Sequence, residues 1–413
     1  MAAPAAEEGW RRVRLGEVTI VVNGTGFPEH FQGRKKLPIP FIKVSDMNSL
    51  GAEIVVSTAA STVDRAMLKE IGAKTCPPGT VIFPKVGGAL LTNKKRLLGT
   101  EAAFDNNVMG IVPLGLDEEW LLYWFQTIDL RQLANTQAMP SIRQSDIAAL
   151  ELRLPPLAEQ RRIAGRLREQ MAEVARARAA VQAQLAAAQA LPAAVLRAHF
   201  TTPAALRWPR RRLGEVVRVQ TGYAFKSDWF TNEGIRLLRN VNVAQGRTTW
   251  EDSVCLPAER RSEFPDFELN AGDIILSLDR PLVSGGLKLT RLTANDVPAL
   301  LLQRVGRFVI KQGVEADYLF RFLQTDGFIR TITAHEQSLG VPHVSPKQIE
   351  EVELPLPPLP EQRALAARLT AELSAATALR ESLAQRLAAI ERLPAALLRT
   401  AFAGAAVPSS AGK

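Results

Sequence analysis

Two long stretches of the chain carry apolar residues at the spacing expected of a helix that pairs with another helix. The first opens with LPPLAEQRR from Leu154, and the second opens with LPPLPEQRA from Leu356, 202 residues later (154 to 356). Their far ends match at the same offset, since LPAAVLRAHF starts at Leu191 and LPAALLRTAF at Leu393. In between, apolar residues recur about every 3.5 positions, which is typical of a seam between paired helices.

The expected seam keeps the same heptad register in both stretches, while Arg, Glu and Gln occupy the other faces. It consists of Ile163, Leu167, Val174, Val181 and Leu185 in the first stretch, and Leu365, Leu369, Leu373, Leu383, Leu387 and Ile390 in the second. At 1.5 Å per residue, some thirty residues span about 45 Å. The alternative is two unrelated surface helices that each pack on their own domain. The matching register at a constant offset favours mutual pairing.

Prolines mark the expected helix boundaries. Pro156 and Pro360 stand where a helix begins, since the first turn needs no backbone donor from them. Pro192 and Pro394 lie inside the apolar pattern, where proline removes a backbone hydrogen bond, so we expect each to end or kink its helix.

The duplication extends beyond the helices. Leu15-Gly16-Glu17-Val18 returns from Leu213, and PSIRQSDIAALELRLPPL from Pro140 matches PHVSPKQIEEVELPLPPL from Pro342. A period near 200 residues is far above that of solenoid repeats and indicates a duplicated globular domain plus helix. The expected domains are a first recognition domain over 1–156, a spacer helix over 157–200, a second recognition domain over 201–357, a second spacer helix over 358–405 and a flexible tail over 406–413.

Each globular domain mixes strand and helix patterns, so the predicted fold class is mixed α/β (α+β). The expected strands are Val18–Val22, Phe41–Val44, Val81–Val86, Val108–Val112 and Glu151–Leu154 in the first domain and Val216–Val219, Leu237–Asn240 and Ile274–Leu278 in the second. Helices are expected over Glu118–Gln132, near Ser145–Leu150 and near Tyr318–Gln324. Trp120, Trp124 and Phe125 recur at helical spacing and are assigned to the core.

Composition narrows the class of protein. The 413 residues carry a net charge of +9, which favours a polyanionic partner, although a basic surface alone is weak support. Cys76 and Cys255 are the two cysteines, which excludes a disulfide framework and suits a reducing cytoplasm. We expect no signal peptide, since Glu7 and Glu8 stand near the start, and no membrane span, since Gln and Arg interrupt the alanine-rich helices.

These features resemble the specificity subunit of type I restriction-modification systems. The likeness covers nearly the whole chain and rests on the doubled LPPL-x-EQR helix starts, on KVGGALLTNKKR from Lys85, and on LLLQRV (Leu300–Val305). The copies differ most at Gly79–Gly99 and Gly272–Leu292, as expected if each domain binds its own version of one kind of ligand.

The resemblance implies two target recognition domains joined by an antiparallel helix pair with pseudo-twofold symmetry. Each domain would read one half of a split, asymmetric sequence in double-stranded DNA, and the helices would set the gap between the halves. Two adenine methyltransferase subunits that use S-adenosylmethionine would dock on the chain. Restriction subunits that use ATP with Mg would join through them, while this chain would itself hold no cofactor.

Motifs for catalysis are missing from the sequence. The Pro-Pro pairs at 77–78, 155–156 and 357–358 lack the flanking residues of an adenine methyltransferase, and there is no GxxxxGK[ST] P-loop. The four histidines show no zinc spacing. We therefore interpret the chain as a non-catalytic reader without a metal site.

Candidate DNA contacts are Lys and Arg for phosphates, and Arg, Asn and Gln for base edges. They are Arg34, Lys35, Lys36, Lys43, Lys85, Asn93, Lys94, Lys95 and Arg96 in the first domain, and Lys226, Arg239, Asn240, Asn242, Arg280, Lys288, Arg291 and Arg304 in the second. The run Lys94–Arg96 is the strongest candidate, although basic clusters are usually solvated surface.

Two other readings stay open. The chain could be the specificity subunit of a methylation-only or fused cut-and-modify complex, which the sequence does not separate from a full restriction system. It could also be a coiled-coil adaptor whose globular domains bind protein, which predicts indifference to DNA.

Overall fold

The computed structural model describes residues 10–49, 54–135, 139–283, 286–334 and 343–403. Contacts divide the chain into two compact units, Met1–Gln182 with Arg386–Lys413, and Ala183–Gln385. Each unit contains one mixed α/β domain together with part of each long helix, α8 (Leu157–Phe200) and α13 (Leu359–Ala401). The fold class is therefore the predicted one, while the predicted tail 406–413 lies outside the described residues.

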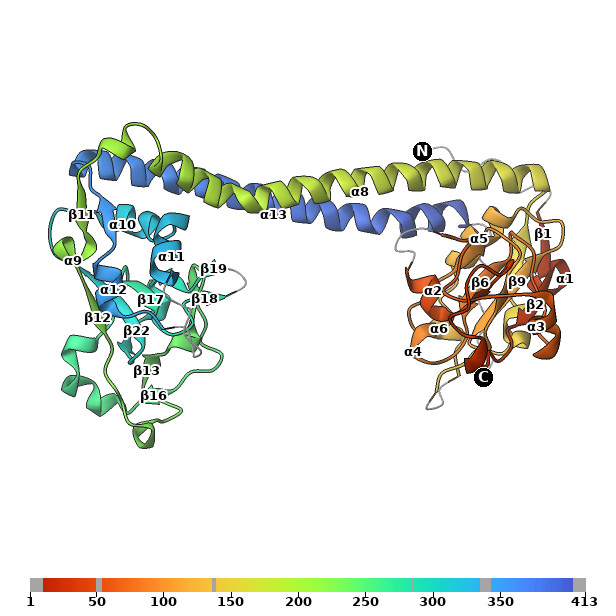
Figure 1. Ribbon diagram of the computed structural model, residues 1–413, viewed down its shortest axis with the longest axis horizontal. Helices are drawn as coiled ribbons and strands as arrows, with labels where there is room; N and C mark the ends of the chain where they lie inside the picture. Colours follow the sequence, from red (N-terminus) through yellow and green to blue (C-terminus); the bar gives the residue numbers. More distant parts are fainter. Residues whose placement is uncertain (1–9, 50–53, 136–138, 284–285, 335–342, 404–413) are drawn as a thin grey trace. The chain divides into compact units, whose positions relative to one another are not determined.

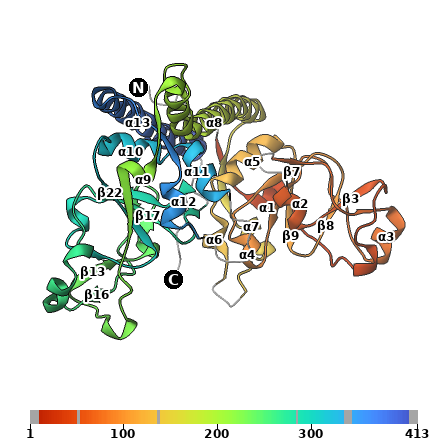
Figure 2. The ribbon, with the colours of Figure 1, turned by 60° about the vertical axis from the view of Figure 1, so that its left-hand side comes forward.

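The first unit is built on a five-stranded sheet with the strand order β2-β9-β6-β7-β4. A smaller sheet, β5-β3-β8, lies beside it with α3, as Figure 2 shows. The strands are β1 (Arg11–Arg14), β2 (Thr19–Asn23), β3 (Ile39–Ile42), β4 (Val55–Val56), β5 (Thr62–Val63), β6 (Val81–Pro84), β7 (Arg96–Leu98), β8 (Ala103–Phe104), β9 (Val108–Pro113) and β10 (Glu151–Leu154). The helices are α1 (Leu15–Val18), α2 (Val44–Ser49), α3 (Arg65–Glu70), α4 (Gly87–Leu90), α5 (Glu118–Gln126), α6 (Leu130–Leu133) and α7 (Gln144–Ala148).

The second unit repeats this topology with four strands in its main sheet in place of five. Its main sheet has the order β12-β22-β17-β20, and its smaller sheet the order β16-β13-β21. The strands are β11 (Arg210–Arg212), β12 (Val217–Thr221), β13 (Ile235–Leu238), β14 (Val243–Ala244), β15 (Arg247–Thr248), β16 (Cys255–Leu256), β17 (Ile274–Ser277), β18 (Leu282–Val283), β19 (Gly286–Leu287), β20 (Leu289–Arg291), β21 (Ala299–Leu301), β22 (Val305–Ile310) and β23 (Glu353–Pro355). The helices are α9 (Leu213–Val216), α10 (Ala316–Phe322), α11 (Asp326–Thr333) and α12 (Pro346–Glu350).

The two copies differ between corresponding strands of the main sheets. In the first unit, α4 lies between β6 and β7 along the chain, whereas β18 and β19 pair as a hairpin between β17 and β20 in the second unit (Figure 1). These are the segments in which the two sequences diverge most.

The core of the first unit forms where α5 meets the main sheet and the long helices. Trp120, Trp124 and Phe125 are almost fully buried there, as the helical spacing predicted. Ile163 and Leu167 of α8 join this core, and so do Leu398 and Phe402 at the end of α13. The expected helix over Glu118–Gln132 is wrong as one element: α5 ends at Gln126, and Asp129 caps the separate helix α6.

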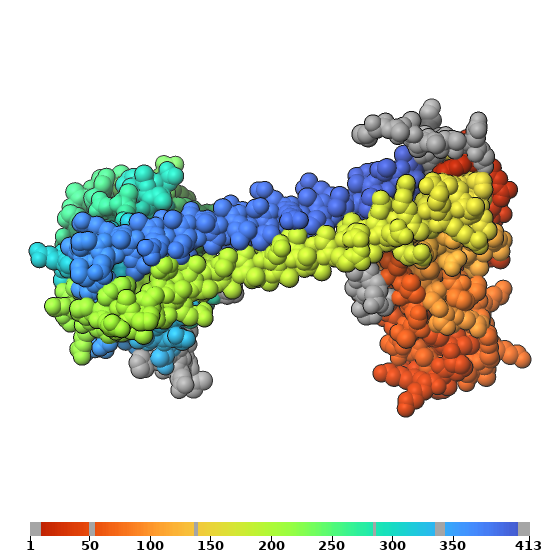
Figure 3. Space-filling view, turned by 90° about the horizontal axis from the view of Figure 1, so that it is seen from above, coloured from red at the N-terminus to blue at the C-terminus, as the bar shows by residue number. Residues whose placement is uncertain are grey.

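Helices α8 and α13 pair in opposite directions. In the first unit, Nε of Arg178 in α8 lies 3.7 Å from Oε1 of Glu391 in α13. In the second unit, Nε2 of His199 in α8 lies 2.9 Å from Oε2 of Glu372 in α13. Figure 3 shows the two helices side by side in each unit. Of the residues in the predicted seam, Leu167, Val181, Leu369, Leu383 and Ile390 are each less than 9% exposed. Its remaining members are Ile163, which is buried, and Val174, Leu185, Leu365, Leu373 and Leu387, which are partly buried.

Two expectations about the helices need correction. Of the two alternatives given for Pro192 and Pro394, a helix end is wrong, since α8 continues to Phe200 and α13 to Ala401. A kink at these prolines stays a prediction. By length and composition, α8 also contains a stretch apolar enough to cross a membrane, contrary to the expectation that Gln and Arg prevent this. One such helix is weak support for a membrane span, because a helix of a soluble protein can pass the same test.

Candidate nucleic-acid interface

In the first unit, three polar side chains meet at one edge of the main sheet. Asn23 ends β2, Lys85 follows β6, and Gln144 begins α7. The Lys85 ammonium donates to Asn23 Oδ1 at 2.7 Å, and the Asn23 amide donates to Gln144 Oε1 at 2.8 Å. Partial burial lowers the pKa of Lys85. The three side chains form a connected row of donors and acceptors.

Backbone contacts hold the segments of this edge together. The Lys85 N–H donates to the Asn107 carbonyl at 2.9 Å, and the Ile142 N–H donates to the Lys85 carbonyl at 3.0 Å. Gly24 lets the strand pass close to the turn before β9, because a Cβ there would lie 1.9 Å from the Asp105 carbonyl oxygen. The edge is therefore fixed by backbone packing, with Asn107 exposed beside it.

The second unit builds the same edge from equivalent contacts. The Leu278 N–H donates to the Arg304 carbonyl, and the Val344 N–H donates to the Leu278 carbonyl, both at 2.9 Å. A Cβ on Gly222 would meet Leu302 backbone atoms at 2.3 Å, as expected of the counterpart of Gly24. The main sheets of both units therefore bring three distant segments of the chain to one place.

A buried carboxylate organises this edge in the second unit. Asp279 accepts from the Arg304 guanidinium at 2.7 Å and contacts His343 Nδ1 at 2.6 Å. Burial alone would raise the pKa of Asp279, but the hydrogen bonds from Arg304 and His343 and their charges lower it. Arg280 and Arg304 have φ of 44° and 67°, a region that non-glycine residues rarely adopt. Arg280 and Arg304, both predicted to contact DNA, therefore have strained backbone conformations close to Asp279.

The predicted candidates that flank strand β3 of the smaller sheet in the first unit are exposed or partly buried. Arg34, Lys35 and Lys36 are exposed, and the Arg34 guanidinium lies 5.1 Å from the centre of the Phe31 ring. Lys43 is partly buried and donates to Gln32 Oε1 at 2.9 Å. Their role in binding stays a prediction.

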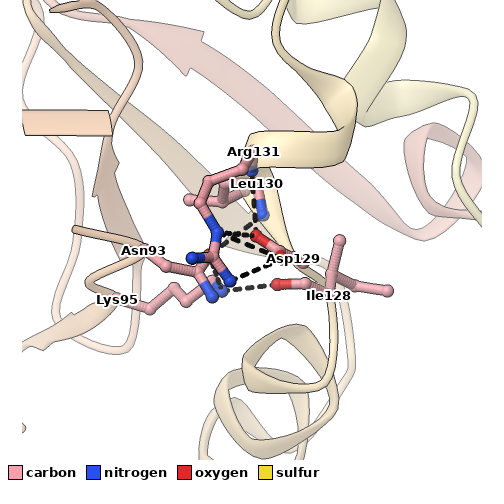
Figure 4. Close-up of polar contacts among 6 residues, drawn as sticks. All are labelled: Asn93, Lys95, Ile128, Asp129, Leu130 and Arg131. Carbon is pink, nitrogen blue, oxygen red and sulfur yellow. Dashed lines mark hydrogen bonds and ion pairs between the residues drawn. The ribbon is translucent and has the colours of Figure 1, made fainter. Parts of the chain in front are cut away.

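Within the run Lys94–Arg96, the structure separates one surface residue from two buried ones. Lys94 is partly exposed and donates to Asn48 Oδ1 at 2.6 Å. Lys95 is 3% exposed, and its ammonium donates to the Ile128 carbonyl at 2.6 Å and to Asn93 Oδ1 at 2.8 Å (Figure 4). Arg96 is 8% exposed within β7. The prediction that Lys95 and Arg96 contact DNA is wrong, because both side chains are buried in the fold.

The same buried cluster constrains the loop before β7. Asn93 has φ of 55° and accepts from the Leu130 N–H at 2.9 Å as well as from Lys95. Burial lowers the pKa of Lys95 to about 8, against the opposing charge of Asp129. The loop that contains Lys94 is therefore attached to the start of α6 through the hydrogen bonds of Asn93 and Lys95.

In the second unit, several predicted contacts serve internal bonds. Asn242 is 1% exposed, and its amide donates to the Thr249 and Asp252 carbonyls, so the prediction that it reads a base is wrong. Lys288 donates to the Asn240 carbonyl, and Arg291 pairs with Asp317 of α10. Arg239 is partly buried and pairs with Asp252 at 3.2 Å. Arg280, Arg304 and Lys226 are exposed and stay predictions.

Sequence reasoning missed a group of aromatic and basic side chains near Lys226. The Arg260 guanidinium lies 3.9 Å from the centre of the Trp229 ring, and Lys226 lies 5.5 Å from that centre. Tyr223, 37% exposed, packs on Phe264 with ring centroids 4.8 Å apart. Asn23 and Gln144 were also missed. The one available signal was that Asn23 and Tyr223 flank the glycine that recurs in both copies, Gly24 and Gly222.

At these sheet edges, amide and guanidinium groups can donate hydrogen bonds and amide oxygens can accept them, as the exposed edges of DNA bases require. The ammonium groups can pair with phosphates. Within the described residues there is no group of three His, Cys, Asp or Glu side chains that could hold a metal ion. The arrangement is suited to binding a polar polyanion.

Comparison with known proteins relates both halves of the chain to one family. Residues 7–176 and 206–391 match the family model described as Type I restriction modification DNA specificity domain. The type I restriction enzyme EcoAI specificity subunit of Escherichia coli is 45% identical over 156 residues, which are 38% of this chain and 26% of that protein. The MjaVIII specificity subunit of Methanocaldococcus jannaschii is 28% identical over 267 residues, 62% of this chain and 63% of that protein. The matched part of this chain thus spans about a quarter of the length of the EcoAI subunit and somewhat under two thirds of the length of the MjaVIII subunit.

Two solved structures share the fold. A chain from a structure of the type I R-M system has a TM-score of 0.71 at 21% identity, with 97% of this chain and 99% of that chain covered. The HsdS subunit from Thermoanaerobacter tengcongensis has a TM-score of 0.64 at 22% identity, with 96% and 97% covered. At these identities the likeness shows the fold alone.

Proposed function

Because the chain belongs to the family of type I restriction modification DNA specificity domains, we propose that it is the DNA-reading subunit of a type I restriction-modification complex. Each recognition domain reads one half of a bipartite, asymmetric target. The antiparallel helix pair sets the gap between the halves. The observation that carries the proposal is the doubled polar edge, built from Asn23, Lys85 and Gln144 in one unit and from Asp279, Arg304 and His343 in the other.

The partners follow from this role. The chain is non-catalytic and acts in the cytoplasm, where two adenine methyltransferase subunits that use S-adenosylmethionine dock on the helix pair. Restriction subunits that use ATP with Mg join the complex through them. The chain itself needs no cofactor. The net charge of +9 supports attraction to the phosphate backbone.

Selection from a pool of random-sequence DNA duplexes tests the proposal. We expect the purified chain, assembled with its modification subunits, to enrich one sequence with two fixed halves and a constant gap. Binding should weaken as salt rises, because Lys and Arg release counterions from the phosphates. Enrichment of no sequence would contradict the proposal and favour a protein-binding adaptor.

The methylation-only or fused alternative predicts the same split target. It is distinguished by incubating the complex purified from its host with unmethylated target DNA, S-adenosylmethionine, ATP and Mg. Cleavage by a separate restriction subunit supports the full system, whereas methylation without such a subunit supports the alternative.

A further inference from the structure

One glutamine in each LPPL-x-EQR motif is buried at the junction between a long helix and its domain. Gln160 of α8 is 2% exposed, and Gln362 of α13 is not exposed at all. They occupy the same place in the repeat, 202 residues apart (160 to 362). Burial of an amide costs free energy unless both its oxygen and its nitrogen are hydrogen-bonded, so each must have partners.

The two glutamines have two equivalent partners each, and Gln362 has one more, because its Nε2 also donates to the Gly313 carbonyl at 3.0 Å. Gln160 Oε1 accepts from the Asp117 N–H at 3.0 Å, and its Nε2 donates to the Pro155 carbonyl at 2.9 Å. Gln362 Oε1 accepts from the Glu315 N–H at 2.8 Å, and its Nε2 donates to the Pro357 carbonyl at 2.8 Å. Each amide thus ties the first turn of a long helix to the segment entering α5 or α10.

The residues whose backbone N–H groups donate to the two glutamine oxygens, Asp117 and Glu315, are themselves helix caps. Asp117 Oδ1 accepts from the Trp120 N–H at 2.9 Å, and Glu315 Oε2 accepts from the Tyr318 N–H at 2.8 Å. In the first unit, Arg168 and Glu119 pair at 3.0 Å further along α8 and α5. The exposed ion pair is weak, so the buried amide is the stronger directional restraint.

We infer that Gln160 and Gln362 are positioning residues that fix the direction in which each long helix leaves its recognition domain, and so fix the gap between the half-sites. This inference rests on the proposed function. A helix of 44 residues is about 66 Å long. A tilt of about 5° at its base displaces the far end by about 6 Å, or roughly two base-pair steps.

The test is the same duplex selection with Gln160→Met, which keeps the side-chain length and removes both hydrogen bonds. We expect the two half-site sequences to be unchanged, while the preference for the wild-type gap over gaps one base pair longer or shorter falls about fivefold. Gln362→Met should act alike from the second unit. Gln182→Met, which removes an exposed amide from the same helix, is the matched control and should change nothing.

An unchanged gap preference in a folded Gln160→Met protein would overturn the inference. So would an equal loss of binding at every gap, because that indicates a purely structural role, or an equal effect in Gln182→Met. If Gln160→Met does not fold, Gln160→Asn replaces it, since it keeps an uncharged amide but is one methylene shorter and loses the reach to both Asp117 and Pro155. Failure of the wild-type protein to select any split sequence would instead contradict the proposed function.

Discussion

Phe402, just beyond the end of α13, packs edge-on against Trp120 of α5, with ring centroids 6.0 Å apart. The second unit repeats this contact with Phe200 of α8 and Tyr318 of α10 at 5.7 Å. In both units, the end of one long helix completes the core beneath the helix that follows the main sheet. Each globular core therefore contains residues of its own domain and residues from the C-terminal end of a long helix, α13 in the first unit and α8 in the second.

This contact predicts that Phe402→Ala destabilises the first unit. Phe402 is 3% exposed, and truncation of a buried Phe typically costs about 3–5 kcal/mol of the free energy of unfolding. Phe200 is partly exposed, so Phe200→Ala should cost less. Leu393→Ala, at a position of α13 that is 43% exposed, is the control. Urea unfolding followed by circular dichroism measures all three. Equal stability of Phe402→Ala and Leu393→Ala would contradict the packing.

The sequence predicted the helix pair best, because a heptad seam reports directly on which side chains are buried. Leu167 and Leu369, at equivalent heptad positions, are both buried. The expected strands around Val18–Val22 and Val108–Val112 fall within a residue or so of β2 and β9. The break after α5 was missed, and at this break the Ile128 carbonyl accepts from Lys95, which is 33 residues away in sequence.

The candidate interface was predicted less well, because a run of basic residues in the sequence does not indicate which of their side chains are buried. Lys94 and Lys95 are neighbours, yet one reaches the surface and the other enters the core. Asn23 and Gln144 are 121 residues apart and meet only because α7 packs beside β2. Such a meeting depends on strand order, which the sequence pattern alone did not supply.

Lys94 and Lys95 should therefore respond differently to replacement by Ala. Lys94→Ala should weaken DNA binding and flatten its salt dependence, with stability unchanged within about 0.5 kcal/mol. Lys95→Ala should lower the free energy of unfolding by about 1–3 kcal/mol, because the Ile128 carbonyl loses its donor. Salt-dependent fluorescence anisotropy and urea unfolding separate the effects. A stability loss in Lys94→Ala with none in Lys95→Ala would reverse this assignment.

The buried ammonium of Lys95 also predicts a pH dependence of stability. Its pKa in the folded protein is about 8, below the ordinary value of 10.5, so between these values the unfolded chain binds more protons. Stability should therefore rise with pH over this window, by on the order of 2–3 kcal/mol. Lys95→Met should lack this rise. The raised pKa of Cys76, about 11, acts in the opposite direction in both proteins and cancels in their difference. Parallel pH profiles for the two proteins would refute the prediction.

Asp279→Asn should affect the second recognition domain alone. The change removes the carboxylate charge that holds Arg304, a predicted DNA contact, and His343 beside it. We expect about tenfold weaker discrimination in one half-site, since a good base contact contributes about 1–3 kcal/mol. Asn23→Ala is the counterpart and should act on the other half-site. Binding to duplexes with single base-pair changes measures both. Identical effects on both halves would show that the two edges do not act separately.

Lengthening both long helices by one heptad should lengthen the gap in the target. Duplicating Ala175–Val181 in α8 and Ala384–Ile390 in α13 keeps the seam in register, because Arg178 faces Glu391 near these segments. Seven residues add about 10.5 Å, or roughly three base-pair steps, while both recognition edges stay intact. Duplication in α8 alone leaves α13 without a matching heptad and should abolish selective binding. The selection from random-sequence duplexes measures the number of base pairs between the two half-sites directly. If the doubly lengthened protein still selects the wild-type gap, the helix pair does not determine the spacing.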